Sequence, residues 1–312
     1  MKFKLLNSLG NQGKPFLFIS DFKAENIEVI LLENLHKEDV EFSISEDYIS
    51  SSHMESLEKL PLPYYEYKKK FNQVIEKIEA GETYLLNLTQ PTKIKTALTL
   101  KEIFTHASSH YKLRYKDKFV CFSPEKFIQI EGAKISTFPM KGTIDASIPN
   151  AEQIILNNQK EMAEHVMVVD LLRNDLSIVA TDVKVEKFRY IESIEAGEKR
   201  LLQVSSHISG NIGDNWHERI GDILKSLLPA GSISGTPKKN TLKIIEETEG
   251  YERGFFSGVF GVYDGEKFDS GVMIRFIEKT EDGFIYKSGG GITVESDAMQ
   301  EYKELLDKIY LP

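Results

Sequence analysis

The stretch VFGVYDGEKFDSGVMIRF, residues 259–276, predicts a β-hairpin, with two largely apolar segments on either side of Asp264-Gly265. An Asp-Gly dipeptide suits a two-residue primed turn between antiparallel strands. A second such dipeptide, at 282–283, leads into another strand candidate at 284–287. Because hairpins dominate here over strand–helix–strand units, we predict an α+β fold with large antiparallel sheets.

The rest of the chain adds helices and further short strands. The segment 65–80 predicts a helix, because Phe71, Val74 and Ile78 recur at helical spacing and Gly81 follows as a stop signal. Further helices are expected at 151–173, 216–227, 237–249 and from about 297. Strands are expected at 83–89, 118–122, 126–131, 134–138, 184–190, 200–212, 259–263 and 267–276.

Composition narrows the class of protein. The 312 residues include 39 Lys and Arg against 48 Asp and Glu, for a net charge of −9. This balance argues against general binding to nucleic acids or acidic membranes, which requires a positive surface. The chain shows neither a membrane-spanning apolar run nor a secretory signal, and its single cysteine, Cys121, excludes an internal disulfide. We therefore expect a cytoplasmic protein of enzyme size.

One candidate catalytic group is Lys141, which lies in the segment STFPMKGT at 136–143. A lysine between the end of a strand and a Gly-Thr turn can project into a pocket, and partial desolvation makes its amine a better nucleophile. Glu125, one strand earlier, could carry protons for such a nucleophile. A solvated turn lysine is the simpler explanation of this segment taken alone.

Two pairs of glutamates are spaced three residues apart, Glu161 with Glu164 and Glu301 with Glu304. This spacing puts both carboxylates of a pair on one face of a helix, where like charges repel mildly. If the two helices converge, the carboxylates could supply oxygen ligands to one Mg²⁺. The sequence does not show convergence, and two solvated acidic faces account for the pairs as well.

Two glycine-rich segments could bind an anion, PAGSISGTPK at 229–238 and SGGGIT at 288–293. The first does not match a phosphate-binding P-loop, because three residues, not four, separate Gly231 from Gly235. The triple glycine at 289–291 could present bare main-chain amides to a carboxylate. A tight turn that excludes side chains explains it as well.

These segments, in this order and spacing, resemble those of the chorismate-utilising enzymes. That family comprises anthranilate synthase component I, aminodeoxychorismate synthase component I, and the isochorismate and salicylate synthases. The resemblance covers roughly residues 65–310 and rests on seven blocks: GETYLLNLTQ (81–90), SPEKF (123–127), TFPMKGT (137–143), AEHVMVVDLLRNDL (163–176), PAGSISGTPK (229–238), Ile274-Arg275, and GGGITVESDAMQEYKE (289–304). It implies an anthranilate synthase component I-like fold, in which two large antiparallel sheets pack together with helices on the outside. It also implies one chorismate-binding catalytic domain over 1–312, with 1–64 as a shortened N-terminal lead-in.

Two positions favour the aminodeoxychorismate synthase branch. That branch carries lysine in the P-x-[KA]-G-T block where anthranilate synthases carry alanine, and here the residue is Lys141. The isochorismate and salicylate synthases place a water-activating lysine at the position of Leu85, and leucine cannot activate water. An anthranilate synthase remains the alternative, because one position is not decisive. A non-catalytic chorismate-binding subunit is a further alternative.

The resemblance also implies a mechanism. A Mg²⁺ ion would bind the ring carboxylate of chorismate. Lys141 would add at C2 as the C4 hydroxyl leaves, with Glu125 as general acid and base, and ammonia would then add at C4 and expel the lysine. The product would be 4-amino-4-deoxychorismate. The metal ligands would be Glu164 and Glu304 directly, and Glu161 and Glu301 through waters. The substrate-binding residues would be Gly142, Thr143, Arg275, Gly289, Gly290, Gly291 and Lys308.

The source of ammonia and two departures from the family pattern complete these expectations. The chain shows no convincing Cys-His-Glu amidotransferase site, so the resemblance implies a separate glutamine amidotransferase subunit as partner. Gln203 stands where the family has a histidine, and Phe256 stands where it has a hydroxylated aromatic residue. Both changes remove a group that could exchange a proton or a hydrogen bond with the substrate.

Overall fold

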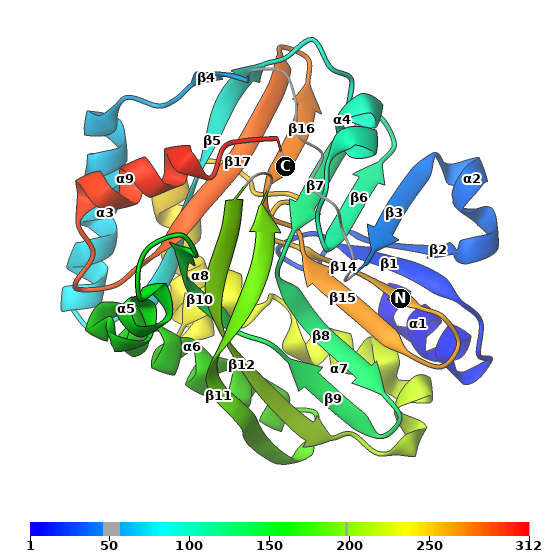
Figure 1. The fold of residues 1–312 in the computed structure, drawn as a ribbon. Helices are drawn as coiled ribbons and strands as arrows, with labels where there is room; N and C mark the ends of the chain where they lie inside the picture. The colour runs from blue at the N-terminus through cyan, green and yellow to red at the C-terminus, as the bar shows by residue number, and fades with distance from the viewer. Residues whose placement is uncertain (46–56, 197–198, 312) are drawn as a thin grey trace.

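The structure, a computed structural model, describes residues 1–45, 57–196 and 199–311. Two antiparallel sheets form its centre, and helices lie outside them (Figure 1). The predicted α+β fold with two large antiparallel sheets and outer helices is therefore confirmed. Among the described residues, no helix is both long and apolar enough to cross a membrane.

Among the described residues, the larger sheet contains nine strands, and both strands of the first predicted hairpin belong to it. Its order is β10 (Met140–Asp145), β12 (Lys199–Asn211), β9 (Lys134–Thr137), β8 (Lys126–Glu131), β15 (Phe268–Val272), β14 (Val259–Tyr263), β1 (Phe16–Ser20) and β2 (Ile27–Leu31), with β11 (Thr181–Ala196) beside β12. In the hairpin, Tyr263 pairs with Phe268, so the connection is the four-residue loop 264–267 and not the expected two-residue turn at Asp264-Gly265. The positive φ of Gly265 shows why glycine suits this loop.

The smaller sheet contains eight strands. Its order is β13 (Gly235–Thr236), β5 (Leu85–Lys95), β17 (Gly283–Ile292), β16 (Phe276–Thr280), β7 (Phe119–Ser123), β6 (Tyr111–Tyr115) and β3 (Val40–Ile44), with β4 (Glu58–Leu60) beside β5. Residues before 65 thus contribute strands to both sheets, since β1 and β2 join the larger sheet and β3 and β4 join this one.

At two adjacent places the chain passes from one sheet to the other through only two or three residues. Pro124 and Glu125 connect β7 of the smaller sheet to β8 of the larger one, and residues 273–275 connect β15 back to β16. The two crossings run side by side, because β8 pairs with β15 and β7 pairs with β16. The amide of Val272 donates to the carbonyl of Glu125 at 3.1 Å, which ties one crossing to the other.

Helices cover the sheets on their outer sides. They are α1 (Lys2–Asn11), α2 (Leu35–Glu38), α3 (Tyr64–Glu79), α4 (Leu100–His106), α5 (Ala151–Asn157), α6 (Gln159–Ser177), α7 (Ile220–Leu227), α8 (Lys238–Glu249) and α9 (Ala298–Asp307), with 3₁₀ turns η1 (Leu32–Asn34), η2 (Asp214–Arg219) and η3 (Gly231–Ile233). Helix α3 confirms the predicted helix at 65–80, since Phe71, Val74 and Ile78 are buried and Gly81 follows with φ of +74°.

Three predicted elements have different bounds in the structure. The single helix expected at 151–173 is two helices, because Asn158 adopts an extended conformation and its side chain caps α6 by accepting from the amide of Glu161. The helix expected at 216–227 begins as the 3₁₀ turn η2 before α7. The strand expected at 267–276 ends at Val272, where the chain leaves the larger sheet.

The strand expected at 284–287 is much longer, because β17 runs from Gly283 to Ile292 and includes the triple glycine. The triple glycine is therefore part of a strand and not the tight turn that one of its two sequence interpretations supposed. Three glycines carry no alternating side-chain pattern, so nothing in their sequence marks a strand. Their conformation is imposed by β5, with Gly289 opposite Thr89 and Gly291 opposite Asn87.

Candidate active site

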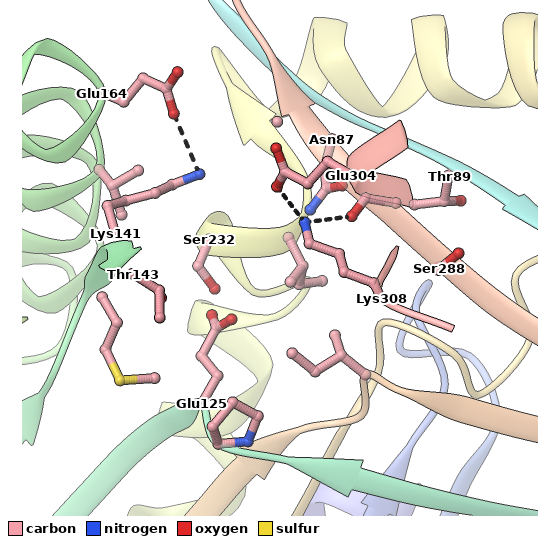
Figure 2. A pocket seen from close by; sticks show the side chains of 18 of the residues that line it. Asn87, Thr89, Glu125, Lys141, Thr143, Glu164, Ser232, Ser288, Glu304 and Lys308 are labelled. Carbon is pink, nitrogen blue, oxygen red and sulfur yellow. Dashed lines mark hydrogen bonds and ion pairs between the residues drawn. The ribbon is translucent and has the colours of Figure 1, made fainter. Parts of the chain in front are cut away.

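A cavity of about 500 Å³ lies where the two sheets meet α6 and α9 (Figure 2). All of the residues that the sequence proposed for catalysis, substrate binding or metal binding line it. They are Glu125, Lys141, Gly142, Thr143, Glu161, Glu164, Arg275, Gly289, Gly290, Gly291, Glu301, Glu304 and Lys308. Segments more than 180 residues apart in the sequence thus meet around one space, which sequence spacing alone does not reveal.

The two crossings between the sheets place Glu125 and Arg275 in this cavity. Arg275 has a positive φ of +48°, and its guanidinium lies over the ring of Tyr310 at 5.3 Å. Glu125 points into the cavity toward Ser232, and Figure 2 shows the two side chains facing one another. The sheet topology therefore sets a cation and a carboxyl group side by side.

Glu125 has the environment of a proton carrier. Desolvation by the surrounding protein raises the pKa of its carboxyl group. The hydrogen bond from Ser232 and the nearby charges of Lys141, Lys308 and Arg275 oppose that rise without cancelling it. A glutamate whose pKa is raised can donate a proton at higher pH than a free glutamate can.

Lys141 reaches the cavity from β10, at the edge of the larger sheet. Its ammonium lies 3.7 Å from Oε2 of Glu164. The pairing of β10 with β12 is irregular between Lys141 and Thr143, where Gly142 has φ of +79°. A Cβ at Gly142 would lie 3.1 Å from Oε2 of Glu161, so glycine leaves room for the acidic side chain.

The helices α6 and α9 converge, which answers the question that the glutamate spacing left open. Glu164 and Glu301 are buried, and the ammonium of Lys160 lies 3.9 Å and 3.7 Å from them, so it bridges the two helices. Lys308 lies 2.8 Å from Glu304. The two carboxylate pairs line one space and have lysines as counter-ions, with Glu164 and Glu301 buried and the side chain of Glu304 57% exposed.

The crowding of carboxylates shifts their proton affinities. Burial, with the charge of Glu164 next, raises the pKa of Glu161. Burial also raises the pKa of Glu301, and Glu304 adds to the rise. Desolvation of Glu304 is outweighed by the charge and hydrogen bond of Lys308, so the pKa of Glu304 is lowered. Within the described part of the chain, no three acidic, histidine or cysteine side chains form a ready-made metal site.

The triple glycine presents an open strand edge to the cavity. Strand β16 pairs with β17 only as far as Lys287, and beyond it no strand formed by the described residues pairs with that side of β17. The amide of Thr89 donates to Glu249, away from β17, so the opposite residue, Gly289, turns its own main chain toward the open edge. Lys308 donates to the carbonyl of Gly289 at 2.9 Å. A Cβ at Gly290 would lie 3.3 Å from Oε2 of Glu301.

Several residues that line the cavity are not among the candidates from the sequence, and Gln203 and Phe256 have no role assigned from the sequence. Lys160, Ser232, Asn87 and Thr89 line the cavity. The signals that could have found them are the blocks at 81–90 and 229–238, which contain Asn87, Thr89 and Ser232, and the position of Lys160 beside Glu161. The two departures, Gln203 and Phe256, also line it. The Oε1 atom of Gln203 is buried, and no described residue hydrogen-bonds to it. Phe256 packs against Phe276 at a ring distance of 6.0 Å.

Comparisons with known proteins support the resemblance. A PabA-like protein of Haemophilus influenzae, itself described as uncharacterized, is 46% identical over 98% of this chain and 94% of its own length. Aminodeoxychorismate synthase component 1 of Salmonella typhimurium is 32% identical over 78% of this chain, and the match spans 56% of that longer protein. MenF, the menaquinone-specific isochorismate synthase of Escherichia coli, has a similar fold, with a TM-score of 0.72 at 13% identity over 97% of this chain and 79% of MenF.

The family description "chorismate binding enzyme" matches residues 18–311, nearly the whole chain. The match includes the residues that line the cavity and both sheets around it. The chain therefore belongs to the chorismate binding enzyme family.

Proposed function

We propose that this chain aminates chorismate to 4-amino-4-deoxychorismate, with ammonia from a glutamine amidotransferase partner and with Mg²⁺. The single observation that carries the proposal is the presence of Lys141 in one cavity with Glu125 and two carboxylate pairs. The described residues from both ends of the chain join the same two sheets, which supports one catalytic domain over 1–312.

The cavity suits a dianionic ring compound. Arg275 and Lys308 are the cations that would pair with the enolpyruvyl carboxylate. The open strand edge at Gly289 and Gly291, together with Gly142, adds main-chain groups without side chains in the way. A protein with a net charge of −9 needs such a local concentration of cations to bind a dianion.

The acidic pairs fit a divalent metal ion, because carboxylate oxygens from two converging helices are the donors that Mg²⁺ prefers. Glu164 and Glu304 would hold the ion directly, and Glu161 and Glu301 through waters. When bound, Mg²⁺ would clamp the ring carboxylate of the substrate and withdraw electrons from the ring.

Lys141 acts as the nucleophile in this proposal. Its neutral amine forms a bond to C2, the ring double bonds shift, and the bond from C4 to the hydroxyl breaks. Glu125 donates a proton to the departing hydroxyl, which leaves as water. Ammonia then forms a bond to C4, the double bonds return, and the bond from C2 to the lysine breaks. Each step conserves atoms and electrons, so no oxidant or reductant is needed.

The need for an ammonia donor rests on the chain's one thiol. Cys121 is fully buried in β7, and burial raises the pKa of its thiol. A glutaminase nucleophile must be an accessible thiolate, so Cys121 is unsuited to the task. Relatives such as that of Salmonella typhimurium are named component 1, which is in keeping with a second subunit.

The deciding experiment incubates the purified chain with chorismate, Mg²⁺ and ammonium, with and without a downstream aminodeoxychorismate lyase. We expect a product with the mass of aminodeoxychorismate, converted to 4-aminobenzoate only when the lyase is present. Anthranilate formed by the chain alone would identify an anthranilate synthase instead. Chorismate binding without turnover at saturating ammonium and Mg²⁺ would identify a non-catalytic subunit.

A further inference from the structure

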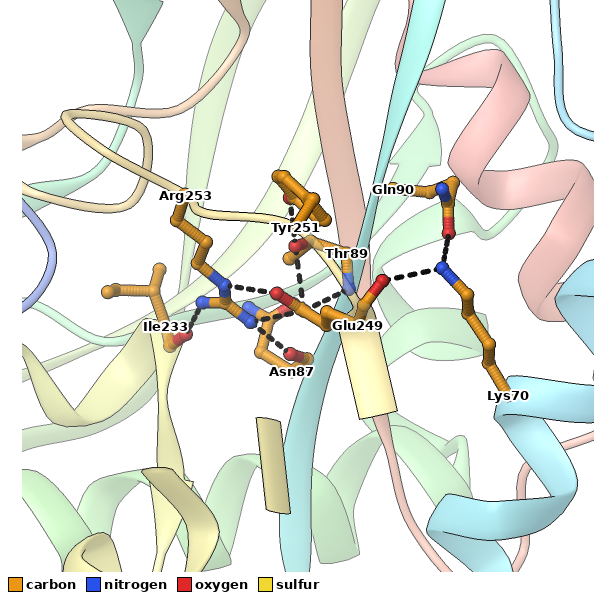
Figure 3. Close-up of polar contacts among 8 residues, drawn as sticks. All are labelled: Lys70, Asn87, Thr89, Gln90, Ile233, Glu249, Tyr251 and Arg253. Atoms are coloured by element: carbon orange, nitrogen blue, oxygen red, sulfur yellow. Dashed lines mark hydrogen bonds and ion pairs between the residues drawn. The ribbon is translucent and has the colours of Figure 1, made fainter. Parts of the chain in front are cut away.

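A buried ion pair lies directly behind one wall of the cavity (Figure 3). The side chains of Arg253 and Glu249 are only 2% and 1% exposed. The guanidinium donates from Nε to Oε2 of Glu249 at 2.9 Å and from Nη2 to Oε1 at 2.6 Å. Neither residue lines the cavity, so neither can touch a bound substrate there.

The remaining side-chain hydrogen bonds of the pair go to residues that do line the cavity. Arg253 donates from Nη1 to the carbonyl of Ile233 at 3.0 Å and from Nη2 to the carbonyl of Asn87 at 2.6 Å. Glu249 accepts from the amide and the hydroxyl of Thr89, at 2.8 Å and 2.7 Å. One ion pair thus joins the 3₁₀ turn η3 to strand β5.

The turn η3 also carries the hydroxyl that meets the proposed proton carrier. Ser232 is the residue before Ile233, and its hydroxyl opposes the rise that burial causes in the pKa of Glu125. Figure 2 shows the two side chains pointing toward one another across the floor of the cavity. The position of Ser232 therefore depends on how η3 is held against β5.

The geometry points to Arg253 and Glu249 as positioning residues: they hold Ile233 against β5 and so keep the Ser232 hydroxyl within reach of the Glu125 carboxyl group. The inference rests on the proposed function only in giving Glu125 its role as proton carrier.

The ion pair of Arg253 and Glu249 is better suited to positioning other residues than to stabilising the fold. Burying two charges costs about as much free energy as their attraction returns, so such pairs add little net stability. A planar guanidinium fixes the directions of its donors, and here they reach a carboxylate and two separate carbonyls. Arg253 is itself held, because its guanidinium stacks 4.4 Å from the ring centre of Phe22 and Lys287 donates to its carbonyl at 2.9 Å.

Four neighbours act on the charge of Glu125. Lys141, Lys308 and Arg275 reach it from β10, the end of α9 and the β15–β16 crossing, and Ser232 reaches it from η3. Among these four, only Ser232 lies on the turn that Arg253 holds. Disturbing Arg253 should therefore remove the hydroxyl donor and leave the three cations in place.

The test measures the titration of Glu125 in the ligand-free full chain by ¹³C NMR of labelled glutamate carboxyls, with Glu125→Gln identifying the resonance. The variants are Arg253→Lys, Ser232→Ala and the two combined. Arg253→Lys keeps a positive charge beside Glu249 but loses the planar fork that reaches both carbonyls. No substrate is present, so the result does not depend on turnover.

The matched control is Arg114→Lys. Arg114 is also a buried arginine, 5% exposed in its side chain, and it pairs with Asp39 and Glu41 on the smaller sheet. It does not line the cavity. We expect this variant to lower the melting temperature without moving the titration midpoint of Glu125.

Ser232→Ala should move the Glu125 midpoint to higher pH, because the carboxylate loses a donor. Arg253→Lys should move it in the same direction, and the combined variant should move it no further than Ser232→Ala does, since Arg253 acts through Ser232. The inference is overturned if either single variant leaves the midpoint in place, or if the two shifts add. If Arg253→Lys does not fold, a Glu249→Gln, Arg253→Met chain, which removes both buried charges together, takes its place with the same expectations.

A kinetic measurement separates this inference from the proposed function. If the wild-type chain aminates chorismate, Arg253→Lys should lower kcat about tenfold while KM for chorismate changes less than about twofold. If the wild-type chain forms no product, the proposed function fails and the NMR titration still decides the inference.

Discussion

The ammonium of Lys141 lies 3.7 Å from Oε2 of Glu164, so the proposed nucleophile and a proposed metal ligand are joined by an ion pair (Figure 2). A cation bound at Glu164 would compete with Lys141 for that carboxylate. Occupation of the acidic cluster and release of the lysine are thus coupled by geometry. This relationship links two roles that the sequence treated as separate.

Replacing Lys141 with alanine should remove amination and leave the fold intact, because Lys141 is half-buried at the edge of a sheet and contributes its amine to the cavity. We expect formation of aminodeoxychorismate to fall by roughly two orders of magnitude or more. Product mass spectrometry measures this loss. The control is Lys303→Ala, which removes an exposed lysine on α9. A Lys141→Ala chain that aminates at the wild-type rate would show that the lysine is not the nucleophile.

Glu125→Gln should lower kcat roughly 10²–10⁴-fold, the usual contribution of a general acid or base. The pH profile gives the sign. Desolvation raises the pKa of Glu125, so its carboxyl group holds its proton to higher pH than free glutamate does. Activity that requires protonated Glu125 is at its maximum below the raised pKa and falls as the pH rises through that pKa. In the glutamine variant that limb of the profile should vanish, and its persistence would assign the limb to another group.

Lys160 should compete with a metal ion for the acidic cluster. Its side chain is 36% exposed, and its ammonium lies 3.9 Å from Glu164 and 3.7 Å from Glu301, beyond hydrogen-bond length. When the four glutamates are ionised, Lys141, Lys160 and Lys308 balance three of the four negative charges, so the cluster has a net charge of −1. Without Lys160 the net charge is −2, which a divalent cation neutralises. Lys160→Met should therefore destabilise the metal-free protein by about 1 kcal/mol or less and increase the stabilisation by Mg²⁺.

Thermal denaturation with and without Mg²⁺ measures both effects of the Lys160 change. Lys160→Arg keeps the charge and should behave as the wild type does. Equal Mg²⁺-induced shifts in Lys160→Met and wild-type protein would contradict competition, and the absence of any shift in both would count against the metal site itself.

The sequence predicts most of the fold because its signals are local. The hairpin around Asp264-Gly265 and the amphipathic α3 each carry their own pattern, and both are confirmed. The triple glycine carries none, and its strand exists because β5 pairs with it. Likewise, a charged residue such as Arg253 is expected at the surface, and its burial follows from carbonyls that other segments bring to it.

The candidate site shows the same difference between local sequence patterns, which can be predicted, and contacts between distant segments, which cannot. Blocks of sequence identify the residues that the family uses, so all of the predicted positions line the cavity. Their contacts depend on where segments meet, and no spacing along the chain gives that. The bridge of Lys160 between α6 and α9 requires the two helices to converge, and the approach of Ser232 to Glu125 requires η3 to pack beside the β7–β8 crossing.

Replacing Gln203 tests whether a residue that binds the substrate lowers the stability of the folded protein. Its Oε1 atom is buried with no hydrogen-bond partner among the described residues, and an unpaired buried acceptor costs free energy. Gln203→Leu keeps a similar volume and removes that acceptor, so it should raise the free energy of unfolding by about 1 kcal/mol. If Oε1 accepts from a substrate hydroxyl, the same variant should bind chorismate more weakly.

Thermal denaturation and chorismate titration measure the two effects, with Gln153→Leu on the exposed face of α5 as control. A Gln203→Leu chain that is less stable than wild type would show that Oε1 is satisfied in solution, and unchanged chorismate affinity would remove Gln203 from the binding surface.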